Sequence, residues 1–284
     1  MRPYRNILAS FFAILAVTLT FTMSNAHAAT SAAQDATSWW THIFPRDNPE
    51  QIKSWTEAAK KTNRAVLDPA DTTFYGKADR LRSFVSQNSV NIIDKEFDSY
   101  STNVPEMLSR LVRHAESPAK GKPHMECSAR TASLYYLLKE AGIRSRIIIV
   151  YPEIATLNSH TYLEVLNPAT GNWEIQDPFL GVYWVFKGTQ KRASTADLLK
   201  HDVRSSFTPC RAASDCGFTK AIEDIVPYYA MASVLDMEGG DSPLLINPDR
   251  HSMREAVQFN GRRKTYCLAR LAICPQRIEK IWEE

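Results

Sequence analysis

The strongest constraint on the fold is a change of hydrophobic period in the middle of the chain. Four apolar residues repeat at helical spacing, namely Leu134, Leu137, Leu138 and Ala141. Gly142 follows them and is suited to end a helix, because glycine readily adopts the left-handed conformation common just past a helix C-terminus. The next segment, 146–150, is a β-branched run with little polar alternation, which predicts a buried strand. A helix followed at once by a buried strand predicts an α+β core.

The next two strand-like segments predict a β-hairpin. Residues 160–166 and 173–176 are separated by six residues rich in turn formers. If the last residue of the first strand pairs with the first residue of the second, His160 becomes the diagonal neighbour of Asp177 on the same face. A slip of one residue would put the two side chains on opposite faces. The register of this hairpin therefore decides whether His160 contacts Asp177.

Cys127, His160 and Asp177 occur in an order that suits a nucleophilic triad. Cys127 opens the predicted helix, His160 follows 33 residues later, and Asp177 lies a further 17 residues on. In such a triad the thiolate attacks an acyl carbon, the imidazole moves the proton, and the carboxylate orients the imidazole. The positive end of the helix dipole favours the thiolate at Cys127. We predict that these three residues are catalytic.

An acyl-transfer site also needs hydrogen-bond donors for the oxyanion that forms when the acyl carbon is attacked. The backbone amide of Cys127 is the donor that we expect, because it belongs to the first turn of the predicted helix. The second donor is not fixed by the sequence. His124 is a candidate only because it lies close to Cys127 in the chain.

Three sequence runs surround these residues: C-S-A-R-T-A-S-L-Y-Y-L-L-K-E-A-G, H-T-Y-L-E-V and W-E-I-Q-D-P. As a set they resemble the transglutaminase-like branch of the papain-like fold, from about Met125 to Trp184. The resemblance implies a cysteine-bearing helix packed on a small antiparallel sheet, with helical extensions on both sides. The chain departs from the family at Tyr162, where tryptophan is frequent, and at Glu126, where small or aromatic residues are frequent.

The triad and the resemblance together predict a cysteine acyl-transfer enzyme that acts on a peptide or side-chain amide, of the protease, amidase or transglutaminase type. A protein or peptide substrate is the expected partner, and this chemistry requires no cofactor. The alternative is a catalytically idle module that keeps the fold and binds a partner in the cell envelope. A metal site at Cys127, His124 and His160 is a lesser alternative, because the sequence lacks the closely spaced ligand pairs of a zinc site.

The first residues predict export from a bacterial cell. Arg2 and Arg5 precede an apolar stretch at about 7–23, and residues 24–28 carry an A-x-A cleavage pattern. We therefore expect a signal peptide over 1–28 and a periplasmic or secreted mature protein. The alternative is an uncleaved anchor in the inner membrane, although polar residues interrupt the apolar stretch and it is barely long enough to span a bilayer. No later segment of the sequence has the length and apolarity of a membrane span.

The cysteines other than Cys127 are even in number, which suits disulfides in an exported protein. They are Cys210, Cys216, Cys267 and Cys274. If Cys267 and Cys274 lie on one helix, they are about 10 Å apart along its axis and cannot bridge to each other. We therefore expect cross-bridges from Cys210 and Cys216 to this pair, and both pairings stay open.

Charge argues against nucleic acid or an anionic membrane surface as a partner. The net charge is +3, and removal of residues 1–28 leaves +1, because that segment holds two arginines and no acidic residue. The sequence also lacks a Gly-rich phosphate-binding loop. The oligomeric state is left open.

The spacing of apolar residues divides the chain expected after signal cleavage into three regions. Apolar stripes at helical spacing predict a helical region at 29–115. The predicted transglutaminase-like core occupies 116–188. The remainder, 189–284, is predicted to be mostly helical and stapled by disulfides.

Overall fold

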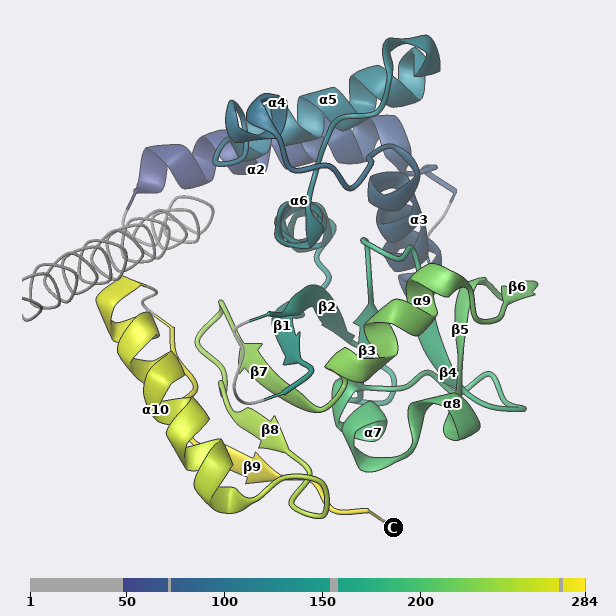
Figure 1. Cartoon of the computed structure of the whole chain (residues 1–284). Coiled ribbons are helices and arrows are strands. Elements are labelled where there is room, and N and C mark those ends of the chain that lie inside the picture. Colours follow the sequence, from purple (N-terminus) through teal and green to yellow (C-terminus); the bar gives the residue numbers. More distant parts are fainter. Residues whose placement is uncertain (1–47, 71–72, 154–157, 271–272, 284) are drawn as a thin grey trace, which may run out of the picture.

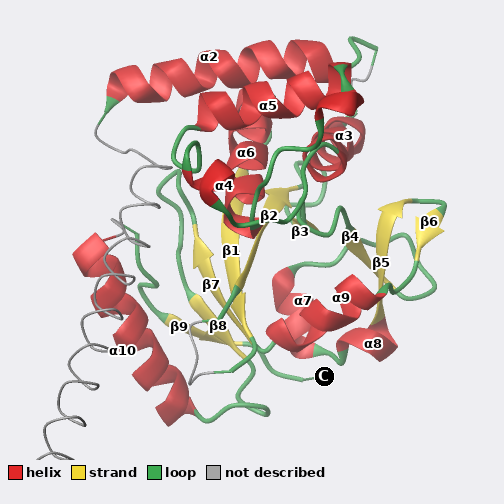
Figure 2. Ribbon diagram, turned by 45° about the horizontal axis from the view of Figure 1, so that its top comes forward, coloured by secondary structure: helices red, strands yellow, loops and turns green. Residues whose placement is uncertain are grey.

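The computed structural model describes residues 48–70, 73–153, 158–270 and 273–283, with only the backbone at 266–270. Within this part the fold is α+β, as the sequence predicts, and helices flank a central sheet (Figures 1 and 2). The signal peptide predicted at 1–28 lies outside the described residues. None of the described helices combines the length and apolarity needed to cross a membrane.

The N-terminal region is helical over its described residues. It contains α2 (Pro49–Val66), α3 (Phe74–Gln87), α4 (Lys95–Asp98), α5 (Val104–Glu116) and the 3-10 turn η1 (Pro118–Lys120). Side-chain caps begin the four α-helices, because each capping oxygen accepts a hydrogen bond from a backbone N–H of the first turn. The capping residues are Asn48, Thr73, Asp94 and Asn103.

Helix α6 (Cys127–Glu140) lies at the centre of the molecule, between the α2 and α5 pair and the sheet (Figure 1). Its residues from Ala129 to Leu138 are all buried. Gly142 follows the helix with φ of 72°, and its N–H donates to the carbonyl of Lys139. The N–H of Ile143 donates to the carbonyl of Leu138, which completes a Schellman motif. The predicted helix and the glycine that ends it are confirmed.

The central sheet has six strands in the order β3-β2-β1-β7-β8-β9. Their bounds are β1 (Ser145–Tyr151), β2 (His160–Leu166), β3 (Trp173–Gln176), β7 (Met231–Leu235), β8 (Leu244–Ile246) and β9 (Ile278–Lys280). Paired strands are antiparallel except β8 and β9, which are parallel. One face of the sheet packs against α2, α3, α5 and α6. The predicted strands at 146–150, 160–166 and 173–176 are therefore confirmed.

The other face of the sheet is covered by the segments that follow β3. These are β4 (Tyr183–Phe186), α7 (Thr195–Lys200), α8 (Val203–Ser206), β5 (Phe207–Ala212) and α9 (Lys220–Ile225), with the 3-10 turn η2 (Val226–Tyr228). The short β6 (Asp215–Cys216) joins β4 and β5 in a second sheet of order β4-β5-β6. Helix α10 (Met253–Arg270) lies beside the sheet edge formed by β9 (Figure 2). The sheet is therefore covered on both faces.

The expectation of a mostly helical region at 189–284 is wrong for five of its segments. Strands β5 to β9 all lie in this region, and β7, β8 and β9 complete the central sheet. Every residue of β7 is buried. A strand buried on both faces has no polar alternation, so its hydrophobic pattern does not differ from that of a short buried helix.

The expected cross-bridges are wrong for Cys210 and Cys216, because these two cysteines are bonded to each other. The hairpin of β5 and β6 places them opposite one another, with 4.0 Å between their Cα atoms. Helix α10 ends at Arg270, so the assumption of one helix through Cys267 and Cys274 also fails. The side chain of Cys267 lies outside the described residues. A disulfide is nonetheless formed, and it is consistent with an exported protein.

The disulfide can be mapped directly, because Arg211 supplies a tryptic cut between its two cysteines. Under non-reducing conditions we expect two peptides, one ending at Arg211 and one beginning at Ala212, to remain joined and to separate on reduction. Replacing both cysteines by serine should lower the free energy of unfolding by about 2 kcal/mol, as expected for a short closed loop. A link from Cys210 or Cys216 to Cys267 or Cys274 would contradict this assignment.

Candidate active site

The β2–β3 hairpin has the register predicted from the sequence, with Leu166 opposite Trp173. His160 and Asp177 are therefore diagonal neighbours on one face. The Nε2 atom of His160 lies 2.7 Å from Oδ2 of Asp177. The two residues are 2 % and 0 % exposed, respectively. The predicted contact between the histidine and the carboxylate is confirmed.

The carboxylate of Asp177 is fixed by the turn that follows β3. Its Oδ1 atom accepts hydrogen bonds from the N–H groups of Phe179, at 2.8 Å, and Leu180, at 3.0 Å. Asp177 and Val182 also exchange backbone hydrogen bonds across the turn. The turn therefore occupies one carboxylate oxygen and leaves the other to His160, which fixes the orientation of the imidazole.

Cys127 is the first residue of α6, is half-buried and takes no part in a disulfide. Its sulfur lies near enough to the imidazole of His160 to help raise the pKa of that ring. Because Nε2 of that ring binds Asp177, Nδ1 is the nitrogen that remains for the sulfur. One turn further along α6, the hydroxyl of Thr131 donates to the carbonyl of Thr161, at 3.0 Å. This bond ties the helix to β2 beside both reacting groups.

The structure thus brings together all three residues that the sequence singled out. Burial lowers the pKa of His160, but the Asp177 carboxylate and the Cys127 sulfur outweigh it and raise that pKa well above its ordinary value. The raised pKa favours the protonated imidazole. A positive ring beside the sulfur and the N-terminus of α6 form the kind of environment in which nucleophilic cysteines are found.

Two aromatic rings enclose the imidazole of His160. The ring of Phe179 meets it edge-on with 5.3 Å between the centroids, and the ring of Tyr162 lies at 5.8 Å. The hydroxyl of Tyr162 is bonded to that of Thr195, at 3.0 Å. Tyr162 therefore packs beside the imidazole with its hydroxyl hydrogen-bonded.

His124 has partners of its own. Its Nδ1 atom lies 2.9 Å from Oδ2 of Asp94, and its carbonyl accepts a hydrogen bond from Tyr100 at 2.6 Å. These contacts give the residue a structural role, and its function as a second oxyanion donor stays a prediction. No group of three His, Cys, Asp or Glu side chains within the described part of the chain is arranged to hold a metal ion. The alternative metal site at Cys127, His124 and His160 is accordingly not formed.

Sequence reasoning missed Arg130, which lies one turn after Cys127 on α6 and is only 4 % exposed. Its guanidinium lies over the ring of Phe179, 5.1 Å from the centroid. A signal was present in the sequence, because Arg130 is a single charged residue among the small uncharged residues that begin the helix, close to a candidate nucleophile. No such signal pointed to Phe179, because the position of this residue depends on the turn after β3.

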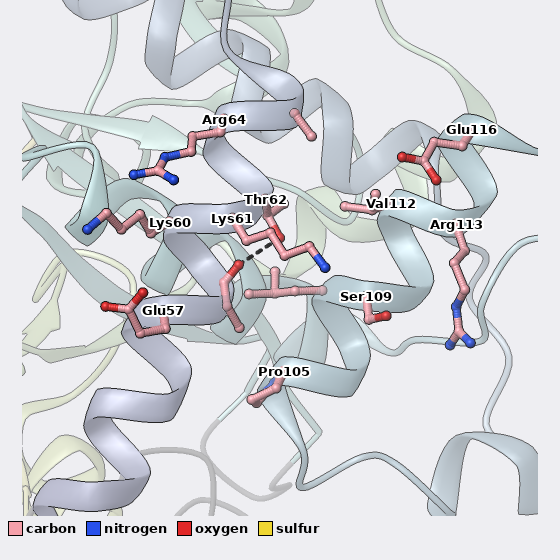
Figure 3. A pocket seen from close by; sticks show the side chains of 13 residues that line it. Glu57, Lys60, Lys61, Thr62, Arg64, Pro105, Ser109, Val112, Arg113 and Glu116 are labelled. Carbon is pink, nitrogen blue, oxygen red and sulfur yellow. Dashed lines mark hydrogen bonds between the residues drawn. The ribbon is translucent and has the colours of Figure 1, made fainter.

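A separate hollow of about 710 Å³ lies in the seam between α2 and α5 (Figure 3). Charged side chains of both signs line it, among them Glu57, Lys61 and Arg113. Its lining residues include no histidine and no cysteine, so the hollow holds no cysteine–histidine pair. The triad at the start of α6 is the stronger candidate for a site of chemistry.

No protein-family model matches the chain, and no curated protein matches it. The functional inference therefore depends on the geometry of the triad and on the sequence motifs that surround it.

The position of the His160 imidazole near the Cys127 sulfur predicts fast alkylation of the sulfur at low pH. Iodoacetamide should label Cys127 well below pH 8, because the raised pKa of His160 keeps the imidazolium in place there. His160→Ala removes that positive charge, so labelling at pH 6 should slow by roughly tenfold or more. The rate is measured by mass spectrometry on the peptide that carries Cys127. Equal pH profiles in both proteins would show that the cysteine is not activated.

Proposed function

We propose that this chain is an exported cysteine acyl-transfer enzyme that acts on a peptide or side-chain amide. The observation that carries the proposal is the position of His160, whose Nε2 lies 2.7 Å from Oδ2 of Asp177 and whose ring lies near enough to the Cys127 sulfur for that sulfur to raise its pKa. The resemblance of the surrounding motifs to the transglutaminase-like branch of the papain-like fold supports the same conclusion. In this proposal Cys127 is the nucleophile, His160 the general acid and base, and Asp177 the orienting carboxylate.

The first half of the reaction forms an acyl-enzyme. The Cys127 thiolate attacks the amide carbon, and the carbonyl oxygen becomes an oxyanion held by the Cys127 N–H, which has no acceptor within the first turn of α6. The amide C–N bond then breaks, and His160 gives its proton to the departing amine. A thioester on Cys127 and a neutral imidazole remain.

The second half resolves the thioester. His160 takes a proton from water or from an acceptor amine as that nucleophile attacks the thioester carbon. The C–S bond breaks, and the thiolate and the imidazolium are restored. Water gives hydrolysis, as in a protease or deamidase, whereas an amine gives transamidation. Asp177 supports both halves because it holds the imidazole in one orientation throughout.

The periplasm or the extracellular space is the proposed location. The disulfide of Cys210 and Cys216 forms and persists in an oxidising compartment. The sequence of residues 1–28 has the charge, apolar stretch and cleavage pattern of a secretory signal. Both features support export.

The proposal is tested with the chain from residue 29 onward as the enzyme. A denatured protein and a glutamine-containing peptide serve as substrates, and three readouts are followed. These are peptide cleavage, ammonia release and incorporation of a fluorescent amine. One of them should proceed in the wild type and fall on the order of 10³-fold or more in Cys127→Ala and in Asp177→Asn. The control is Arg204→Met, which changes a surface residue that is 56 % exposed and pairs with Glu223, and leaves the triad intact.

The three readouts also distinguish the reaction types. Cleavage alone indicates a protease, ammonia release without amine incorporation a deamidase, and amine incorporation a transglutaminase. Turnover that survives in folded Cys127→Ala would eliminate the proposed nucleophile. A wild type that is reactive toward iodoacetamide but silent in all three readouts would instead favour the idle binding module.

A further inference from the structure

Arg130 joins the two segments that carry the nucleophile and the orienting carboxylate. Its Nε atom donates to the carbonyl of Met125 at 3.1 Å, two residues before Cys127. Its Nη1 atom donates to the carbonyl of Phe179 at 2.9 Å, two residues after Asp177. One side chain on α6 thus fixes the entry to the helix and the exit from β3.

The charge of Arg130 is buried without a carboxylate in direct contact. No ion pair involves Arg130 in the part of the chain that the structure describes. A buried guanidinium whose partners are carbonyl groups alone has a large cost of desolvation. Burial lowers its pKa to about 10, while the nearby negative charges of Asp177 and Cys127 act in the opposite direction. Asp177 and Cys127 are therefore the acidic groups near enough to the guanidinium to act on its charge.

The charges of the proposed working site balance only when Arg130 is included. The thiolate of Cys127 and the carboxylate of Asp177 each carry one negative charge, and the imidazolium of His160 carries one positive charge. Without Arg130 these three side chains carry a net charge of −1, and this excess of negative charge disfavours the thiolate. The guanidinium of Arg130 cancels the excess.

The other titratable groups around the site do not supply this balance. Burial raises the pKa of Glu126, which favours its neutral form. Burial also raises the pKa values of Tyr162 and Tyr229 well above the ordinary value, so both phenols stay neutral. Arg82 also acts on Asp177, but its charge is paired with Asp79 at 3.4 Å, and its guanidinium donates hydrogen bonds to a glutamine side chain and a backbone carbonyl.

We propose that Arg130 is a positioning residue that keeps Cys127 in its thiolate form, by cancelling the excess negative charge of the triad and by fixing the segments on both sides of it. The inference rests on the proposed function, because it takes the thiolate and imidazolium pair as the working state. Arg130 acts through Cys127 and Asp177 and contacts no reacting atom.

The test is the pH profile of iodoacetamide labelling at Cys127. Arg130→Met and Arg130→Gln remove the charge, and each should slow labelling at pH 6 by about tenfold and move the midpoint of the profile up by about one pH unit. Arg130→Lys keeps the charge and should hold the wild-type midpoint. Arg204→Met is the matched control, because Arg204 is 56 % exposed and pairs with Glu223 on the protein surface. Its profile should equal that of the wild type.

The outcomes separate this inference from the proposed function. Neutral variants that fold, as judged by circular dichroism, and label with the wild-type midpoint would overturn the role of Arg130, while the activated cysteine would stand. A wild type that labels only above pH 8 would defeat the proposed function itself. If both neutral variants fail to fold, the labelling profile of Arg130→Lys decides whether the positive charge matters. A wild-type midpoint in that variant supports the role of the charge, and a midpoint displaced as far as in His160→Ala overturns that role.

Discussion

The hydrogen bond between His160 and Asp177 is the interaction on which the rest of the site depends. Both side chains are buried, so burying the charge of either one without the other would cost much free energy. The bond requires one hairpin register, because a shift of one residue in β2 would turn the histidine to the opposite face. It also requires the turn after β3, whose N–H groups hold the second carboxylate oxygen. Local backbone geometry therefore sets the charge state of the imidazole.

Helix α6 serves the hydrophobic core and the candidate chemistry at the same time. Its middle is buried between the other helices and the sheet, which leaves its first turn little freedom to move (Figure 1). The bond from Thr131 to the carbonyl of Thr161 fixes the helix against β2 at the level of the triad. A nucleophile placed on such a rigid element is held in position before any substrate arrives, and this preorganisation favours catalysis.

A buried polar network supports the end of β3 from the side away from His160. Gln176 accepts a hydrogen bond from Arg82 at 3.1 Å and donates one to Asp79 at 3.1 Å. Asp79 in turn accepts two bonds from Arg192, at 2.8 and 2.6 Å. The network links α3, β3 and the segment after β4. It holds the residue next to Asp177, so the position of the carboxylate depends on contacts between distant parts of the chain.

The sequence by itself determined the local elements and singled out the three residues of the candidate triad. The period of 134–141, the β-branched run 146–150 and the turn between the hairpin strands fixed a helix and three strands, because each pattern depends on neighbours in the chain. Tertiary structure decided the rest. Strands β7 to β9 joined the sheet, Cys210 paired with Cys216, and Arg130 met the carbonyls of Met125 and Phe179. The strand order and the contact of Arg130 with Phe179 depend on which distant segments meet, and a pattern of neighbouring residues does not reveal that. The Cys210–Cys216 bond depends on the hairpin of β5 and β6, which the sequence pattern did not reveal either.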